Sequence, residues 1–161
     1  MPIKLVTFRD RTFELDFERT YEVYQSVELG SPEKCSCNGC KNFVAQRDNI
    51  YPPEFRTLLH ELGVDHHKEA EVFHVCKLEN GLHWYEGCFH FKGKIVDNVD
   101  NSTELSSALT RLEILELNSH FELMFLKSNH LSFFGEDEEL IQIEFKAMSE
   151  WVIDENLEPK N

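Results

Sequence analysis

The sequence predicts an α+β fold, mainly an antiparallel β-sheet of about seven strands with two or three short helices. Apolar and polar residues alternate over several segments, whereas one segment has the spacing of an amphipathic helix. The composition agrees, because 41% hydrophobic residues and 13 Phe supply a well-filled core. A chain of 161 residues suits one such core, so we expect a single globular domain at 1–153 and a polar tail at 154–161.

The first thirty residues have the alternation of β-strands. Residues 3–8 and 12–18 are the first two predicted strands, joined by a turn at 10–11. The same even spacing continues through residues 21–29, which predicts more strand there. Near the C-terminus, residues 115–125 alternate again, and an acidic turn at 135–139 joins a final predicted pair, 131–134 and 140–146.

Helices are predicted in the middle of the chain. Residues 42–48 lack strand alternation and suit a short helix. Pro52-Pro53 opens a clearer one, whose apolar residues lie at i, i+3, i+4 and i+7 on one face, and Gly63 suits its C-terminal cap. These apolar residues are Phe55, Leu58, Leu59 and Leu62. A third short helix is expected at 102–112.

A β-hairpin is predicted around Asn80-Gly81, a dipeptide that favours a type I′ turn between residues 70–78 and 82–95. A two-residue loop would place Cys76 opposite Tyr85 and His74 opposite Gly87. Cys76 and His74 would then share one face of the sheet. A slip of register by one residue would reverse the face.

The net charge of the chain narrows the classes of molecule that it is expected to bind. Thirty acidic and 16 basic residues give a net charge of −14, which disfavours nucleic acid and anionic membranes because both are negatively charged. A basic protein partner or a bound cation fits better. The same acidic residues also serve simply to keep a protein in solution.

The sequence predicts a cytoplasmic protein. Residues 1–8 lack the pattern of a secretory signal, and no stretch approaches the roughly 18 to 20 apolar residues of a membrane span. The five cysteines are odd in number and three of them crowd into six positions, unlike an extracellular disulfide framework. We therefore expect thiols or thiolates in a reducing compartment.

Cys35, Cys37 and Cys40 are the candidate metal ligands. Cys37 and Cys40 have the C-x2-C spacing of a metal knuckle, and Gly39 permits the tight turn that such a knuckle needs. Cys35 adds a third sulfur. Three soft ligands suit Zn²⁺, with Cu⁺ or an iron–sulfur cluster as rarer choices.

A structural zinc site needs a fourth ligand. His74 and Cys76 on the predicted hairpin are the first candidates for it. His60 and the run Asp65-His66-His67 are further candidates, although adjacent histidines diverge on a regular element and suit a solvated loop.

Two other interpretations of the cysteine cluster remain open. The three residues can be free thiols that pack a loop, because cysteine behaves as a small buried hydrophobe. They can also include a redox pair, since C-x2-C at a helix start lowers a thiol pKa. The βαβ context of a thioredoxin-like site is absent, which disfavours this third interpretation.

No catalytic residue is predicted. The sequence has no G-x-S-x-G elbow, phosphate-binding loop or dinucleotide fingerprint. The leading hypothesis is therefore a non-enzymatic acidic binding domain with a structural Zn²⁺ site at the cysteine cluster. The alternative is a thiol-dependent enzyme or redox protein that uses Cys37 or Cys40.

Four motifs together resemble a group of uncharacterised small bacterial proteins. These motifs are Cys35-x-Cys37-x2-Cys40-x-Asn42-Phe43, Leu62-Gly63-Val64-Asp65, Tyr85-Glu86-Gly87 and Phe91-Lys92-Gly93. The matching stretch covers roughly a third to a half of the chain. The resemblance implies that this stretch is one unit, and it implies no reaction, substrate or ligand.

Overall fold

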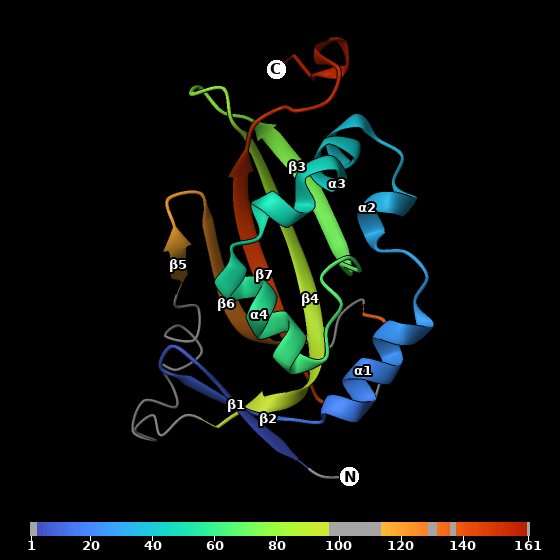
Figure 1. Ribbon diagram of the computed structural model, residues 1–161, viewed down its shortest axis with the longest axis vertical. Helices are drawn as coiled ribbons and strands as arrows, with labels where there is room; N and C mark the ends of the chain where they lie inside the picture. The colour runs from blue at the N-terminus through green and yellow to red at the C-terminus, as the bar shows by residue number, and fades with distance from the viewer. Residues whose placement is uncertain (1–2, 97–113, 129–131, 136–137, 161) are drawn as a thin grey trace.

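The computed structural model describes residues 3–96, 114–128, 132–135 and 138–160. Within these residues a seven-stranded antiparallel sheet carries helices on one of its faces (Figure 1). The predicted α+β fold is therefore confirmed. The helix expected at 102–112 lies outside the described residues.

One long strand, β4, organises the sheet. Its N-terminal part pairs with β3 and its C-terminal part with β2, while its opposite side pairs with β7. The strand order across the sheet is β1-β2-β4-β7-β6-β5, and β3 pairs with β4 outside this series. The strands are β1 Lys4–Phe8, β2 Arg11–Leu15, β3 Glu71–Lys77, β4 His83–Ile95, β5 Leu115–Asn118, β6 Phe121–Ser128 and β7 Leu140–Ser149.

The described helices connect β2 to β3. They are α1 Phe17–Ser26, α2 Ser31–Lys34, α3 Asn38–Ile50 and α4 Pro53–Leu62, and a 3-10 turn, Glu155–Leu157, lies near the C-terminus. The predicted α4 is confirmed, and Gly63 caps it in the left-handed conformation at φ 83°. Helix α3 contains the predicted helix at 42–48 but begins earlier, at Asn38, so that Cys40 lies within its first turn.

Helix α1 stands where a strand was expected at 21–29, so that prediction is wrong. Strand β2 ends at Leu15, and the Asp16 carboxylate then accepts a hydrogen bond from the backbone N–H of Arg19 at 3.0 Å. This N-terminal cap starts the helix. The even spacing of apolar residues concealed a helical face on which Thr20, Val23 and Tyr24 are buried.

Two strands near the C-terminus also differ from expectation. Residues 115–125 form the β5–β6 hairpin instead of one strand, because the chain turns where the Asn118 side chain accepts a hydrogen bond from the His120 N–H at 2.7 Å. Residues 132–134 are not in a strand. On the side away from β4, β7 pairs instead with β6, from Phe121 to Ser128.

The β3–β4 hairpin has a three-residue loop at 79–81, not the expected two-residue turn. Leu78 donates its N–H to the carbonyl of Leu82 at 2.7 Å, and Gly81 has a φ of 90°. A glycine with positive φ is typical of three-residue hairpin loops. The pairing of the two strands is therefore one residue out of the expected register from the turn onward.

A bulge between His74 and Cys76 shifts the register once more. His74 consequently lies opposite Tyr85, while Cys76 lies opposite Trp84. Tyr85 and Trp84 are neighbours in β4, so their side chains point to opposite faces of the sheet. The prediction that His74 and Cys76 share a face is thus wrong.

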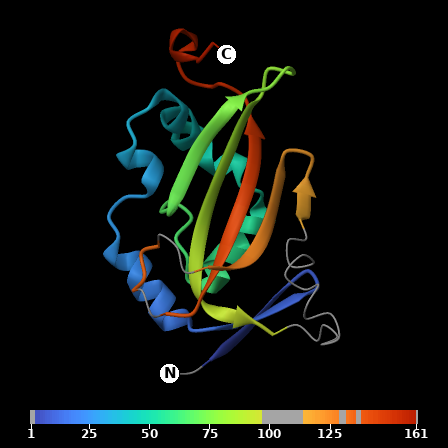
Figure 2. The ribbon, with the colours of Figure 1, turned by 180° about the vertical axis from the view of Figure 1, so that it is seen from behind.

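The core fills the space between the sheet and helices α3 and α4. Each of its central aromatic side chains is at most 2% exposed. They are Phe43, Tyr51, Phe55, Phe89, Phe121 and Phe145. The opposite face of the sheet, which we call the outer face, carries no helix among the described residues (Figure 2).

The segment expected to be a polar tail contacts the sheet. The Glu158 carboxylate lies 2.9 Å from Nε2 of His83 and 2.9 Å from Nζ of Lys77. These contacts hold the described end of the chain beside the β3–β4 hairpin. No helix in the described part of the chain combines the length and apolarity that crossing a membrane requires.

Candidate metal centre

Three sulfur atoms meet where α2 ends and α3 begins. The Sγ atoms of Cys35, Cys37 and Cys40 all lie within 4.8 Å of one another. Cys35 is the C-cap of α2, Cys37 is the N-cap of α3, and Cys40 lies in the first turn of α3. The prediction that these sulfurs gather around a shared centre is confirmed.

The two helix ends explain why the sulfurs converge. Cys35 donates its N–H to the carbonyl of Ser31 at 3.1 Å, which closes α2. Cys37 is extended, and its Sγ accepts a hydrogen bond from the N–H of Cys40 at 3.3 Å. Sulfur thus takes the place of the oxygen that usually caps a helix.

The three thiols differ in exposure, and the pKa of Cys35 and that of Cys40 are displaced in opposite directions. Cys40 is buried, whereas Cys35 and Cys37 are exposed. A hydrogen bond from the backbone of Cys37 lowers the pKa of the Cys35 thiol, and burial raises the pKa of Cys40 far above its usual value. A bound cation would overcome the second effect, because a coordinating thiol is deprotonated outright.

His74 lies over this site without joining the sulfur group. A Cβ at Gly39 would be 2.6 Å from the Cβ of His74. Nε2 of His74 is 2.8 Å from Nδ1 of His83, whose Nε2 contacts Glu158. The ring of His74 is thus held by another histidine.

No fourth metal-binding side chain completes the cluster within the described residues. His74, Cys76 and His60 each lack a ligand atom within 4.8 Å of all three sulfurs. Cys76 lies opposite Trp84, on the other face of the hairpin from His74. An ion on the three sulfurs would therefore have a coordination position open to water or to another molecule.

A buried ion-pair network fixes α2 to α3 beside the sulfurs. The Arg47 guanidinium is 2.6 Å from Glu33 of α2 and 2.9 Å from Glu69, and the Tyr51 hydroxyl donates to Glu69 at 2.6 Å. The side chains of Arg47 and Glu69 are 5% and 0% exposed, so water screens this network little. Sequence reasoning missed it, since its members are far apart and match no motif.

Asn42 fixes the first turns of α3 to the end of β7. Its Nδ2 donates to the Tyr85 hydroxyl at 2.9 Å and to the Glu150 carbonyl at 3.1 Å, and its Oδ1 accepts from the Val152 N–H at 2.7 Å. Asn42 is fully buried. These hydrogen bonds thus anchor the helix that carries Cys40 to the sheet and to the segment after β7.

No family model, curated protein or solved structure matches this chain. The resemblance of the cysteine motif to a bacterial group therefore stays a prediction, and the function has to be inferred from the sites themselves.

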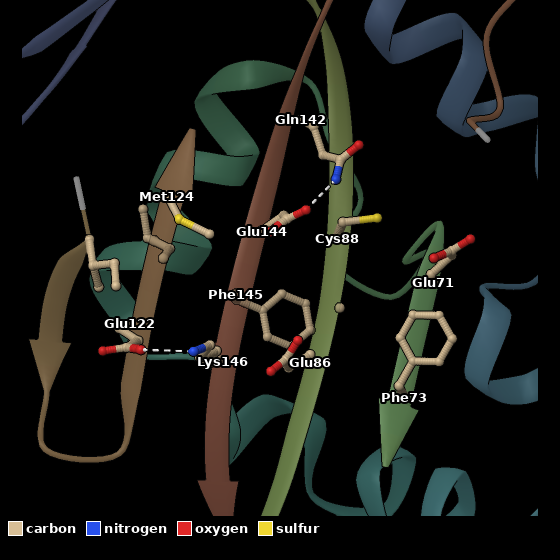
Figure 3. Close-up of a pocket in the computed structure, with 13 residues that line it drawn as sticks. Glu71, Phe73, Glu86, Cys88, Glu122, Met124, Gln142, Glu144, Phe145 and Lys146 are labelled. Atoms are coloured by element: carbon tan, nitrogen blue, oxygen red, sulfur yellow. Dashed lines mark hydrogen bonds and ion pairs between the residues drawn. The ribbon is translucent and has the colours of Figure 1, made fainter. Parts of the chain in front are cut away.

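The outer face of the sheet holds a second feature that the sequence did not reveal. Four glutamates and one lysine line a pocket of about 100 Å³ there, too small for most organic ligands (Figure 3). Lys146 is 3.9 Å from Glu122, and Gln142 donates to Glu144 at 2.7 Å. The charged lining residues are Glu71, Glu86, Glu122, Glu144 and Lys146.

Proposed function

We propose that the protein is an acidic binding domain that holds one thiophilic metal ion, with Zn²⁺ the first candidate, on Cys35, Cys37 and Cys40. The observation that supports this most is the mutual approach of the three sulfurs. Thiolates are the preferred ligands of Zn²⁺ and of Cu⁺. The ion would bond the end of α2 to the start of α3.

The surroundings favour a role in stabilising this connection. Glu33 and Arg47 already fix α2 to α3 at a neighbouring point. The positive end of a 13-residue helix also favours thiolate charge on its first turn. With all five cysteines free, a reducing compartment, which we propose is the cytoplasm, would keep the ligands available.

Metal analysis of the freshly purified full-length chain tests this proposal. We expect about one zinc per chain, a loss of that zinc in Cys37→Ser, and full zinc content in Cys76→Ser. Cys76 is the matched control because it lies outside the sulfur group. An equal metal content in all three proteins would overturn the proposal.

Thiol exchange is a second candidate function, and the unequal exposure of the C-x2-C pair favours it. The exposed Cys37 thiolate would attack a disulfide of a substrate protein and release one substrate thiolate. The buried Cys40 would then displace the other, which leaves a Cys37–Cys40 disulfide and a reduced substrate. The Cys40 thiol gives its proton to one substrate thiolate, and the other substrate thiolate carries the negative charge that Cys37 brought.

A chloroacetamide probe separates these two functions. If the cysteines hold a metal, alkylation is slow and speeds up when a chelator is added. If Cys37 is a redox nucleophile, it is alkylated faster than the other cysteines with or without the chelator. Mass spectrometry of the labelled peptides identifies the cysteine.

For the acidic outer face we propose a lysine- or arginine-rich segment of another protein as partner. The support is charge complementarity, because glutamates dominate the pocket and Phe73 beside them is 56% exposed. Binding of an oligolysine peptide should weaken in a Glu86→Gln/Glu122→Gln variant and stay unchanged in Glu61→Gln, an exposed residue of α4. Equal binding by all would contradict this.

A further inference from the structure

A second group of metal-binding side chains lies at the other end of α3. One ligand atom each from Asp48, His66 and His67 lies within 4.8 Å of the other two. Asp48 is in the last turn of α3, and the two histidines occupy the turn after α4. Adjacent histidines were expected to diverge on a regular element, but these two lie in a turn, as the expected loop allows, and their ring centroids are 4.0 Å apart.

The distances suit a tetrahedral ion. Nε2 of His67 is 3.3 Å, and Nε2 of His66 2.8 Å, from the same oxygen of Asp48. Two ligands of a tetrahedral Zn²⁺ with bonds of about 2.0 Å are separated by about 3.3 Å. The His67–Asp48 pair already has that separation, and the His66–Asp48 pair has to open by only about 0.5 Å.

A neighbouring carboxylate orients one of the ligands. Oδ1 of Asp65 is 3.2 Å from Nδ1 of His67 and accepts the His67 backbone N–H at 2.9 Å. A histidine that donates Nδ1–H to a carboxylate presents Nε2 with a free lone pair, the arrangement found behind zinc-binding histidines. Here Nε2 of His67 is the atom that faces Asp48.

The exposure of the group suits an exchangeable ion. The side chains of Asp48 and His67 are 64% and 50% exposed, so water can fill the remaining coordination positions. His66 is less exposed, and its ring meets that of Tyr51 with centroids 6.1 Å apart. Imidazole with carboxylate suits Zn²⁺, Ni²⁺ or Cu²⁺ better than Mg²⁺ or Ca²⁺.

We propose that Asp48, His66 and His67 bind a divalent transition-metal ion, Zn²⁺ first, with Asp65 as a positioning residue for His67. The ion ties the end of α3 to the turn after α4. It is separate from the cysteine cluster, because Cys37 and Asp48 are about 16 Å apart along the helix. Helix α3 thus carries one candidate metal site at each end.

Titration of the full-length chain with Zn²⁺ tests this site. Calorimetry measures the binding, and NMR of the ¹⁵N-labelled histidine side chains shows which residues take part. We expect the Nε2 resonances of His66 and His67 to shift as zinc binds, whereas those of His60 stay in place. His60 is the internal control, because it is exposed on α4 and outside the group. Unshifted His66 and His67 resonances at saturating zinc would overturn the proposal.

Variants then assign the ligands. Asp48→Asn and His67→Ala should each weaken zinc binding at this site about tenfold or more, and Asp65→Ala about 10- to 100-fold. His60→Ala should leave it unchanged. An affinity for zinc in Asp48→Asn and His67→Ala equal to that of the unmodified chain would contradict the assignment.

A parallel titration with Co²⁺, read by its absorption spectrum, distinguishes this site from the cysteine site. Co²⁺ on thiolates gives a strong sulfur-to-metal charge-transfer band, which Co²⁺ on imidazole and carboxylate does not give. Shifted histidine resonances without that band would support the histidine site and count against the cysteine site. The band without shifted resonances would support only the cysteine site and overturn the present proposal.

Discussion

His74 of β3 lies directly against Gly39 of α3, since a Cβ at position 39 would be 2.6 Å from the Cβ of His74. The Tyr85 hydroxyl donates to the Gly39 carbonyl at 2.9 Å in the same place. The helix that carries Cys40 is therefore seated on the β3–β4 hairpin through a position without a side chain. Gly39 lies in the first turn of α3 and is not a glycine with positive φ, so this close approach, and not the expected tight turn, requires glycine in the cysteine motif.

Gly39→Ala should lower the free energy of unfolding by about 1–3 kcal/mol, because the new methyl group overlaps His74. Urea denaturation measures the change. Gly135→Ala is the control, since a Cβ there would have its nearest neighbour, Oε2 of Glu138, at 3.5 Å. Equal midpoints for the two variants would show that α3 can move away from the hairpin at little cost.

Asn42→Leu should lower the free energy of unfolding by about 2–3 kcal/mol. The substitution keeps the size of the side chain but leaves the part-buried Val152 N–H and the buried Tyr85 hydroxyl without their bonds to Asn42. Asn49→Leu on the exposed side of the same helix is the matched control. A loss no larger than that of the control would contradict the anchoring role of Asn42.

Arg47→Met should cost about 3–5 kcal/mol of stability, because it leaves the buried Glu69 carboxylate without its cation. Lys41→Met, at an exposed position of the same helix, should have little effect. The double variant Arg47→Met/Glu69→Gln should recover part of the loss, since it also removes the unpaired charge. Thermal unfolding, monitored by circular dichroism, measures the stability of the three variants. A double variant less stable than Arg47→Met would contradict this reasoning.

The ion pair between Arg19 and Glu138 predicts a pH dependence of stability. Hydrogen bonding to Arg19 lowers the pKa of Glu138 from 4.5 to about 2. A carboxylate with a lowered pKa in the folded state stabilises the fold above about pH 4.5, and this contribution is lost as the pH falls toward 2.

Glu138→Gln should accordingly reduce stability by about 1 kcal/mol at pH 7. The difference from the unmodified chain should shrink between pH 4.5 and 2. Glu139→Gln, at the exposed neighbouring position, serves as the control. A difference that stays constant over this range would show that the charge of Glu138 is not responsible.

The elements that the sequence predicted correctly are those whose signals are local. Helix α4 combines an opening proline, one apolar face and a capping Gly63, and it was found with its correct end. The convergence of the three sulfurs depends on two adjacent helix ends within six positions. Helix α4 and the sulfur cluster both depend on residues that are close together in the chain, so the sequence alone was enough to predict them.

The elements that the sequence misjudged depend on a single residue or on distant contacts. Asp16 ends a strand and starts α1, although the alternation continues beyond it. One extra loop residue moved Cys76 to the other face, and the bulge beyond it returned His74 to the expected face, because each shift by one residue reverses the side chain. The meeting of Asp48 with His66 depends on where α3 and the turn after α4 lie in space, which no local pattern specifies.

X-ray absorption spectroscopy at the zinc edge, on the full-length chain loaded with one equivalent of Zn²⁺, most directly tests whether the three cysteines form a metal site. We expect three sulfur scatterers at about 2.3 Å and one nitrogen or oxygen scatterer. The sulfur signal should fall in Cys37→Ser and remain in Cys76→Ser. A zinc environment made only of nitrogen and oxygen would contradict the cysteine site, even with the metal fully bound.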